Sequence, residues 1–196
     1  MKFLIATHNE HKCVEFKRIL APLGIDAVRS EDVGIMLSDA EETGETFREN
    51  ARIKAESGCK ESSMVCVADD SGLVVDALGG RPGVHSARYA GGHDVPYDVK
   101  INTLLKELEN VPREKRTARF VSAVCCVFPD GRVLEVEQTC EGYIGYEPKG
   151  AGGFGFDPIF YVGDKSFAEL SGEEKDVVSH RGKSLRLFSE KIKDYI

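Results

Sequence analysis

Two adjacent carboxylates follow a short apolar run near the middle of the chain. Residues 67–72 read Val-Ala-Asp-Asp-Ser-Gly, so Asp69 and Asp70 come directly after a strand-like stretch. If the strand ends there, both acids lie at the rim of a sheet, where open α/β sheets bind ligands. Neighbouring carboxylates repel each other, which favours a bound cation or a shifted proton. Because Mg²⁺ is held by one or two carboxylates together with substrate phosphates, we expect a magnesium–phosphate site; the alternative is a polar turn that only closes a strand.

A second polar segment, Thr7-His-Asn-Glu-His-Lys12, joins a short apolar run to a helical pattern. Free N–H groups at a helix start, aided by Thr7, Asn9 and Lys12, form a site for phosphate anions. The alternative is an ordinary helix cap followed by an exposed lysine. His8 and His11 are less suited to a metal, because no third ligand lies nearby in the sequence.

Acidic residues also precede the next helical pattern. Glu41 and Glu42 stand a few residues before it, and Lys54 lies within it. Acids at a helix start are explained by the helix dipole alone. Together with Asp70 they could instead complete an oxygen cage for Mg²⁺, with Lys54 facing a phosphate or the attacking water.

A glycine-rich segment at 152–158 alternates glycine with aromatic rings and ends on an acid. Glycine lets a flat ligand approach the backbone, and Phe154 or Phe156 could stack on a base, although both rings could equally pack in the core. Asp157 could accept a hydrogen bond from a purine ring N–H. Donors that suit a carbonyl-bearing base follow downstream, unless they only mark a solvated helix start: Lys175, His180 and Arg181.

The elements that must position these residues alternate along the chain. Strands are expected at residues 3–7, 64–68, 73–78, 117–128 and 132–140, the last two joined by a Pro-Asp-Gly hairpin turn at 129–131. Helices are expected from Asn9 to Pro22, with Phe47, Ala51 and Ala55 on one face, from Tyr97 to Leu108, and from about Ser184. Strands interleaved with helices indicate an α/β fold with a mixed sheet.

Composition sets the class of protein. The chain has 196 residues, 41% hydrophobic, and a net charge of −7, which predicts a single globular domain over 1–196 with neither nucleic acid nor an anionic membrane as its main partner. Its six cysteines form no Cys-x-x-Cys pair, and Cys66, Cys125 and Cys126 lie in apolar runs. This pattern favours buried free thiols in the cytoplasm over extracellular disulfides. The apolar run at 3–6 is too short for a signal peptide.

Six ordered motifs between residue 3 and about residue 190 make the chain similar to one family. They are Thr-x-Asn-x-x-Lys, Glu-Thr-Gly-x-Thr-Phe-x-Glu-Asn-Ala-x-x-Lys-Ala, Ala-Asp-Asp-Ser-Gly-Leu, Gly-Gly-x-Pro-Gly-x-x-Ser-Ala-Arg-Tyr, Gly-Gly-Phe-Gly-Phe-Asp-Pro-Ile-Phe and Ser-His-Arg-Gly. The set resembles the inosine triphosphate pyrophosphatases, also called Ham1-like or RdgB-like pyrophosphatases. Phe156 stands where some members carry another aromatic residue, which bears only on stacking strength.

The resemblance implies an elongated mixed β-sheet flanked by helices, with two lobes around a nucleotide-binding cleft, in a homodimer. It implies hydrolysis of ITP, dITP and XTP to the monophosphate and pyrophosphate with Mg²⁺, which keeps deaminated purines out of DNA and RNA. Asp70 would be general base and metal ligand, supported by Asp69, Lys54 and either Glu42 or Glu41. Substrate contacts would fall on Thr7, His8, Asn9, Glu10, His11, Lys12, Ser71, Phe154, Gly155, Phe156, Asp157, Lys175, His180 and Arg181.

Two other functions are alternatives to this one. Maf-like nucleotide pyrophosphatases prefer other bases, and the Phe-Gly-Phe-Asp and Ser-His-Arg motifs argue against them. A nucleotide sensor without turnover would not need Asp69, Asp70 and Lys54 together. A P-loop NTPase is excluded, because no Gly-x-x-x-x-Gly-Lys-Ser/Thr occurs.

Overall fold

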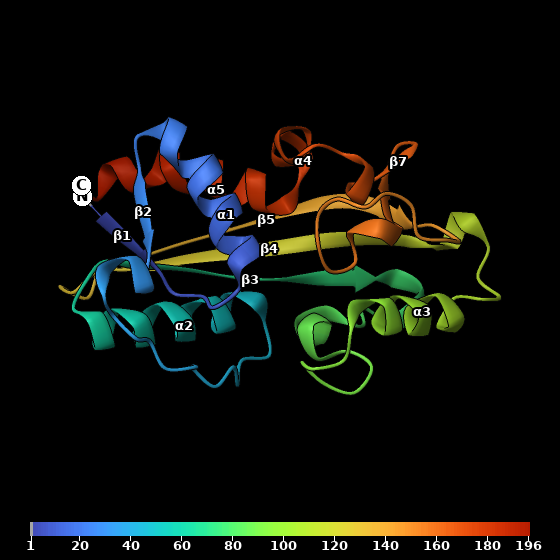
Figure 1. The fold of residues 1–196 in the computed structure, drawn as a ribbon, viewed down its shortest axis with the longest axis horizontal. Helices are drawn as coiled ribbons and strands as arrows, with labels where there is room; N and C mark the ends of the chain where they lie inside the picture. The colour runs from blue at the N-terminus through green and yellow to red at the C-terminus, as the bar shows by residue number, and fades with distance from the viewer. Residues whose placement is uncertain (1) are drawn as a thin grey trace. The chain divides into compact units, whose positions relative to one another are not determined.

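The computed structural model, which describes residues 2–196, contains one mixed seven-stranded sheet with the strand order β2-β1-β3-β4-β5-β6-β7 (Figure 1). The strands are β1 (Lys2–Ile5), β2 (Asp26–Arg29), β3 (Cys66–Val75), β4 (Thr117–Val127), β5 (Val133–Ile144), β6 (Phe160–Val162) and β7 (Lys165–Ser166). The main helices are α1 (Glu10–Leu20), α2 (Phe47–Ser62), α3 (Tyr97–Glu107), α4 (Gly172–Val178) and α5 (His180–Lys191). β1 pairs in parallel with β2 and β3, whereas β5, β6 and β7 are antiparallel. The predicted α/β fold with a mixed sheet is confirmed.

The prediction that a strand ends at the acidic pair is wrong. β3 runs without a break from Cys66 to Val75, so Asp69 and Asp70 lie in its middle. What ends there is the neighbouring strand. The last register pair between β1 and β3 joins Ile5 to Val67. The acids therefore stand just beyond the end of the parallel part of the sheet, while their own strand continues.

Several short elements were not predicted. β2, β6, β7 and α4 are between two and seven residues long, and α5 begins at His180 rather than near Ser184. The short strands are defined by their pairing with distant segments, as β2 is by β1. A period of two or 3.6 residues cannot be recognised over such lengths.

Contacts divide the chain into two compact units. The first contains the residues up to 70 together with 122–138 and 180–196, and the second contains 71–121 and 139–179. The first unit is thus assembled from three separate stretches of sequence. Each unit has its own apolar core.

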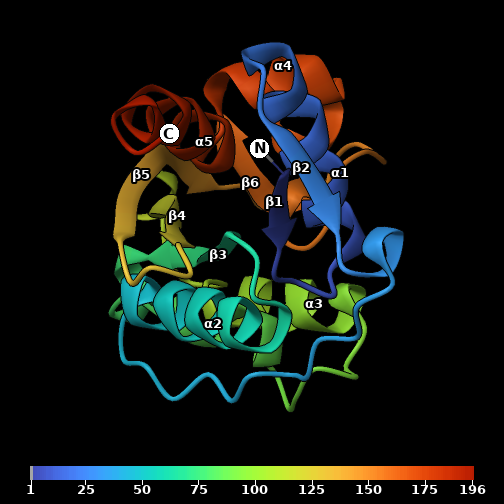
Figure 2. The same ribbon diagram turned by 90° about the vertical axis from the view of Figure 1, so that its left-hand side faces the viewer.

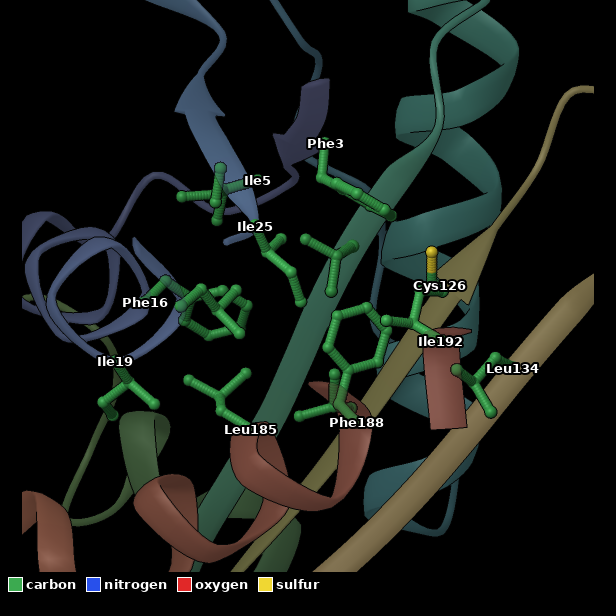
Figure 3. Packing of buried hydrophobic residues seen from close by; sticks show 14 of the residues in the cluster. Phe3, Ile5, Phe16, Ile19, Ile25, Cys126, Leu134, Leu185, Phe188 and Ile192 are labelled. Carbon is green, nitrogen blue, oxygen red and sulfur yellow. The ribbon is translucent and has the colours of Figure 1, made fainter. Parts of the chain in front are cut away.

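Side-chain alternation along the strands divides the core of the first unit into two layers. Phe3 and Ile5 of β1 pack with α1 and α5, whereas Leu4 packs with α2. Figure 2 shows α1 and α5 on one side of these strands and α2 on the other. In the layer under α1 and α5, Phe16 and Phe188 lie among the β1 side chains (Figure 3). Successive strand residues point to opposite faces, so each strand residue here is assigned to one helix layer or the other.

The second unit contains a buried arginine that is hydrogen-bonded to backbone carbonyls. Arg116 donates hydrogen bonds to the carbonyls of Leu108, Val111 and Gly145 at 2.6, 2.9 and 2.8 Å. These carbonyls belong to the end of α3, the loop after it, and the residue after β5. Arg116 therefore ties three segments of backbone together around the core of this unit.

The expected buried free thiols are confirmed. All six cysteines are buried and none forms a disulfide. Burial raises the pKa of Cys66 to about 11, so its thiol stays protonated and unreactive at neutral pH. Within residues 2–196, no helix combines the length and the apolar character needed to cross a membrane.

We expect Phe16→Ala to lower the free energy of unfolding by about 3–5 kcal/mol, because it opens a cavity in the layer under α1 and α5. Val14→Ala is a matched control on the same helix. Its side chain is 57% exposed, so the change should stay within about 0.5 kcal/mol. Urea unfolding of both variants measures the difference. Equal losses in the two variants would contradict the assigned packing.

Candidate active site

The continuous strand β3 sends its two acidic side chains to opposite faces of the sheet. Asp69 follows Val67 in alternation and contacts residues of α1 and α5. Asp70 points to the other face and contacts residues of α2. The repulsion expected between neighbouring carboxylates is reduced in this way, because each has its own cationic partners. Two chemically different sites result from one dipeptide.

Asp69 is the centre of a buried network of charges. Arg181 donates to Asp69 Oδ2 through Nε at 3.1 Å and Nη2 at 2.9 Å, and through Nη1 to the carboxylate of Glu15. Lys12 Nζ lies 3.1 Å from Asp69 Oδ1, an ion pair without the alignment of a hydrogen bond. Asp69 and Arg181 are almost wholly inaccessible to solvent.

The electrostatics of this network fix its charge state. Burial opposes ionisation of Asp69, but Arg181 and Lys12 together hold the pKa of this carboxyl far below its usual range. Burial also lowers the pKa of Lys12, and the nearby cations Lys54 and Arg181 add to that effect, against the attraction of Asp69. A further negative charge nearby would therefore stabilise the protonated form of Lys12.

A second cluster lies under α2. Lys54 Nζ is 3.0 Å from Asp70 Oδ1 and 2.8 Å from Glu42 Oε1, and Asn50 Nδ2 donates to Asp70 Oδ2 at 3.4 Å. Burial raises the pKa of Asp70, and the Lys54 ammonium works against that rise. For Lys54, burial is outweighed by Asp70 and Glu42, so its pKa is raised and the ammonium is kept.

The Asp70–Glu42 pair fits a divalent cation. Both carboxylates contact the ammonium of Lys54, so positive charge is stabilised at this place. In the chain from residue 2 onward, no group of three His, Cys, Asp or Glu side chains is placed to hold a metal ion. Two carboxylates with further ligands from phosphate and water is the usual arrangement for Mg²⁺. Of the two glutamates considered, Glu42 makes this contact and Glu41 is exposed.

The segment before α1 is a capped helix start. Asn9 Oδ1 accepts from the Lys12 backbone N–H at 3.1 Å, and Thr7 Oγ1 accepts from the Asn9 N–H at 3.2 Å. The cap predicted at Asn9 is thus confirmed. His8 forms an ion pair with Asp39 when protonated, and its neighbours Glu10 and His11 are exposed. The first turn of α1 thus supplies backbone N–H groups and carries Lys12, and both kinds of donor suit a phosphate.

A third group belongs to the second unit. Lys175 Nζ donates to Asp157 Oδ2 at 2.6 Å, and the same oxygen accepts from the Phe154 N–H at 2.8 Å. Lys175 Nζ also lies 4.8 Å from the centre of the Phe154 ring. Gly153 has φ of +67° and a Cβ there would come within 2.1 Å of Asp157 Oδ2, so only glycine permits this turn.

The two phenylalanines of the glycine-rich segment differ in role. Phe156 is buried, with Tyr89 and Tyr97 packed edge-on against it at 6.1 and 5.5 Å between ring centres. Core packing therefore explains Phe156. Phe154 is only half-buried, so it is the ring that can stack on a base. Gly155 keeps a positive φ of +66° between them.

The structure groups the expected residues differently from the sequence. Lys12, Lys54, Asp69, Asp70 and Glu42 come together in the first unit, as does Arg181; the second unit holds residues 154–157, Lys175 and Ser71. His180 is buried at the start of α5. Arg181 was expected to contact a base; in the structure its Nε, Nη1 and Nη2 atoms each donate a hydrogen bond to Asp69 or Glu15.

Two residues of the site were missed from the sequence. Glu15 follows Lys12 by three residues and is buried beside Phe16, so a charge on the apolar stripe of α1 was the available signal. Asn50 precedes Ala51 on the buried face of α2, where an amide needs partners. Neither signal identifies the charged partner, which is Arg181 for Glu15 and Asp70 for Asn50.

A mixed sheet with a capped helix start, partly buried lysines and a carboxylate pair defines an α/β protein suited to a phosphorylated ligand. The chain belongs to the Ham1 family, whose model matches residues 3–191. A dITP/XTP pyrophosphatase of Bacillus licheniformis is 50% identical over 188 residues, 95% of each chain. One of Geobacillus kaustophilus is 47% identical and covers 100% of this chain and 96% of its own.

Solved structures agree with the family assignment. The Staphylococcus aureus Ham1 protein has a TM-score of 0.85 at 38% identity, covering 100% of both chains. A HAM1 protein from Coxiella burnetii has a TM-score of 0.87 at 36% identity, covering 99% of both chains. The resemblance identified from the six motifs is confirmed.

Asp69→Asn should lower the free energy of unfolding by about 3–5 kcal/mol at pH 7, because it leaves Arg181 and Lys12 without their shared carboxylate. The folded pKa of Asp69 lies below the unfolded value of about 3.9, so its contribution is complete above that pH. As the pH falls further, the difference between wild type and variant should shrink by about 1.4 kcal/mol per pH unit.

Urea unfolding in metal-free buffer between pH 3 and pH 7 measures this difference. Asp26→Asn, at an exposed position of β2, is the control and should change little. A difference that is independent of pH would contradict the charge state assigned to Asp69.

Proposed function

We propose that this protein hydrolyses deaminated purine nucleoside triphosphates, namely ITP, dITP and XTP, to the monophosphate and pyrophosphate. The observation that carries the proposal is the Asp70–Lys54–Glu42 cluster beside Lys12 in a Ham1-family chain. The names of the related dITP/XTP pyrophosphatases support the same reaction. The protein would thereby keep deaminated purines out of DNA and RNA.

The first unit would bind the triphosphate. The α1 start and Lys12 supply N–H groups and an ammonium, and charge that develops on a leaving pyrophosphate would be stabilised there. Asp69 and Arg181 would keep Lys12 in place rather than touch the substrate. A phosphate near Lys12 would also offset the cost of burying its charge.

Asp70 and Glu42 would hold Mg²⁺, which when bound neutralises phosphate charge and makes water easier to deprotonate. Asp70 would orient the attacking water and accept its proton, because it is the buried carboxylate with a raised pKa. Lys54 would remain protonated between the two carboxylates. With substrate bound, its ammonium would face a phosphate oxygen. These roles agree with the charge states that the contacts produce.

The second unit would bind the purine base. Phe154 would stack on the ring, and Lys175, held by Asp157, would donate to the 6-keto oxygen. Adenine has an amino group at that position, which cannot accept from Lys175. A site whose buried donor is left without an acceptor discriminates strongly against such a substrate.

We further propose that the protein is a cytoplasmic homodimer. Its family resemblance supports the dimer, and six buried free thiols support a reducing compartment. Light scattering on the purified protein gives the number of chains directly.

Purified protein with Mg²⁺ should release pyrophosphate and monophosphate from dITP and XTP much faster than from dATP and GTP. Release of inorganic phosphate in place of pyrophosphate would contradict cleavage between the α- and β-phosphates. Binding of dITP without any product would favour a sensor.

Asp70→Asn should reduce kcat for dITP by about 10²–10⁴-fold, because the carboxylate that accepts the proton is gone. The fold should survive, since Asn can still contact Lys54 and Asn50. Steady-state kinetics and circular dichroism measure both properties, and Asp26→Asn serves as the exposed control. A variant with more than half of the wild-type kcat would rule out this role for Asp70.

Lys175→Met and Lys12→Met should separate base recognition from phosphate binding. Loss of Lys175 should shrink the preference for dITP over dATP, because its contact is specific to one base. Loss of Lys12 should raise KM for both substrates by a similar factor, since the triphosphate is the same in both nucleotides. kcat/KM for both nucleotides, with thermal stability recorded alongside, tests this. Equal losses on both nucleotides for Lys175→Met would remove its base-reading role.

A further inference from the structure

Asn50 is a buried amide whose two polar atoms both face parts of the proposed site. It lies on α2 and is completely inaccessible to solvent. Its Oδ1 accepts from the Gly44 backbone N–H at 2.8 Å, and its Nδ2 donates to Asp70 Oδ2 at 3.4 Å. A single side chain thus connects the loop before α2 with the central strand.

The loop that carries Glu42 is packed closely against the start of α2. A Cβ on Gly44 would lie 2.6 Å from Glu49 Cβ and 2.7 Å from Asn50 Oδ1, which leaves no room for a side chain. Glu49 accepts from the N–H of Glu45 and of Thr46 at 2.8 and 3.0 Å. The loop between Gly44 and Thr46 therefore has a defined position, and Asn50 provides its innermost contact.

Asn50 and Lys54 are four residues apart and lie on the same face of α2. Lys54 joins Glu42 to Asp70 through Oδ1, and Asn50 joins Gly44 to Asp70 through Oδ2. The two oxygens of Asp70 are thus held by different side chains of one helix. With Asn50 on one carboxylate oxygen and Lys54 on the other, the plane of the Asp70 carboxylate is set from two sides.

We propose that Asn50 is a positioning residue for the reaction, which fixes both the orientation of the Asp70 carboxylate and the distance between Asp70 and the Glu42 loop. This inference rests on the proposed function. The amide is suited to the task, because its nitrogen donates to an ionised carboxylate while its oxygen accepts from a backbone N–H. Small displacements of a reacting group lower rates strongly, so the contact affects turnover more than binding.

Two variants separate the contacts of Asn50. Asn50→Ala removes both, whereas Asn50→Asp keeps an acceptor for the Gly44 N–H but replaces the amide donor by a second carboxyl group against Asp70. We expect both to lower kcat for dITP by about 10–100-fold with KM changed less than about twofold, because Lys12 is not touched. Amide hydrogen exchange at Gly44 should accelerate in Asn50→Ala and stay slow in Asn50→Asp.

Cys59→Ala is the matched control, since Cys59 is buried on the same helix and is not part of the site. It should lose stability while keeping kcat. A kcat within twofold of wild type in Asn50→Ala would overturn the proposal, as would an equal loss of kcat in Cys59→Ala. If wild type releases no pyrophosphate, the proposed function fails instead. In that case unchanged Gly44 exchange in Asn50→Ala would also overturn the positioning contact.

Discussion

The alternation of side chains along β3 is the constraint on which the site depends. Because the strand continues through Asp69 and Asp70, the two carboxylates must point to opposite faces. One meets α1 and α5, and the other meets α2. A turn at this place, as the sequence suggested, would have put both acids on the same edge of the sheet. A bound metal ion would then be needed to offset the repulsion between them.

The two faces have different properties as a result. On the Asp69 side, Asp69 and Arg181 are sealed from water and paired with each other, and Lys12 forms an ion pair with the same carboxylate. On the Asp70 side, Lys54 and Glu42 are only partly buried. Of the two carboxylates, Asp70 is therefore the one with the more accessible partners.

Local spacing predicted much of this arrangement from the sequence. The Asn9 cap and the helix that carries Phe47, Ala51 and Ala55 depend on residues near one another or on one helix face. The partners of Arg181 could not be predicted, because Asp69 is 112 residues away. Two consecutive acids also interrupt the apolar pattern of β3, and only distant cations make a continuous strand possible there.

The first unit is composed of three stretches of sequence, and this has a consequence for its synthesis on the ribosome. Its first 70 residues contain β1, α1, α2 and the acidic pair, but α5, which bears Arg181 and Phe188, lies about 110 residues further along. At typical elongation rates the nascent chain waits roughly 5 to 20 seconds for that helix. During this interval Asp69 has no Arg181, and one face of β1 is uncovered. A chaperone that shields this segment would act in that window.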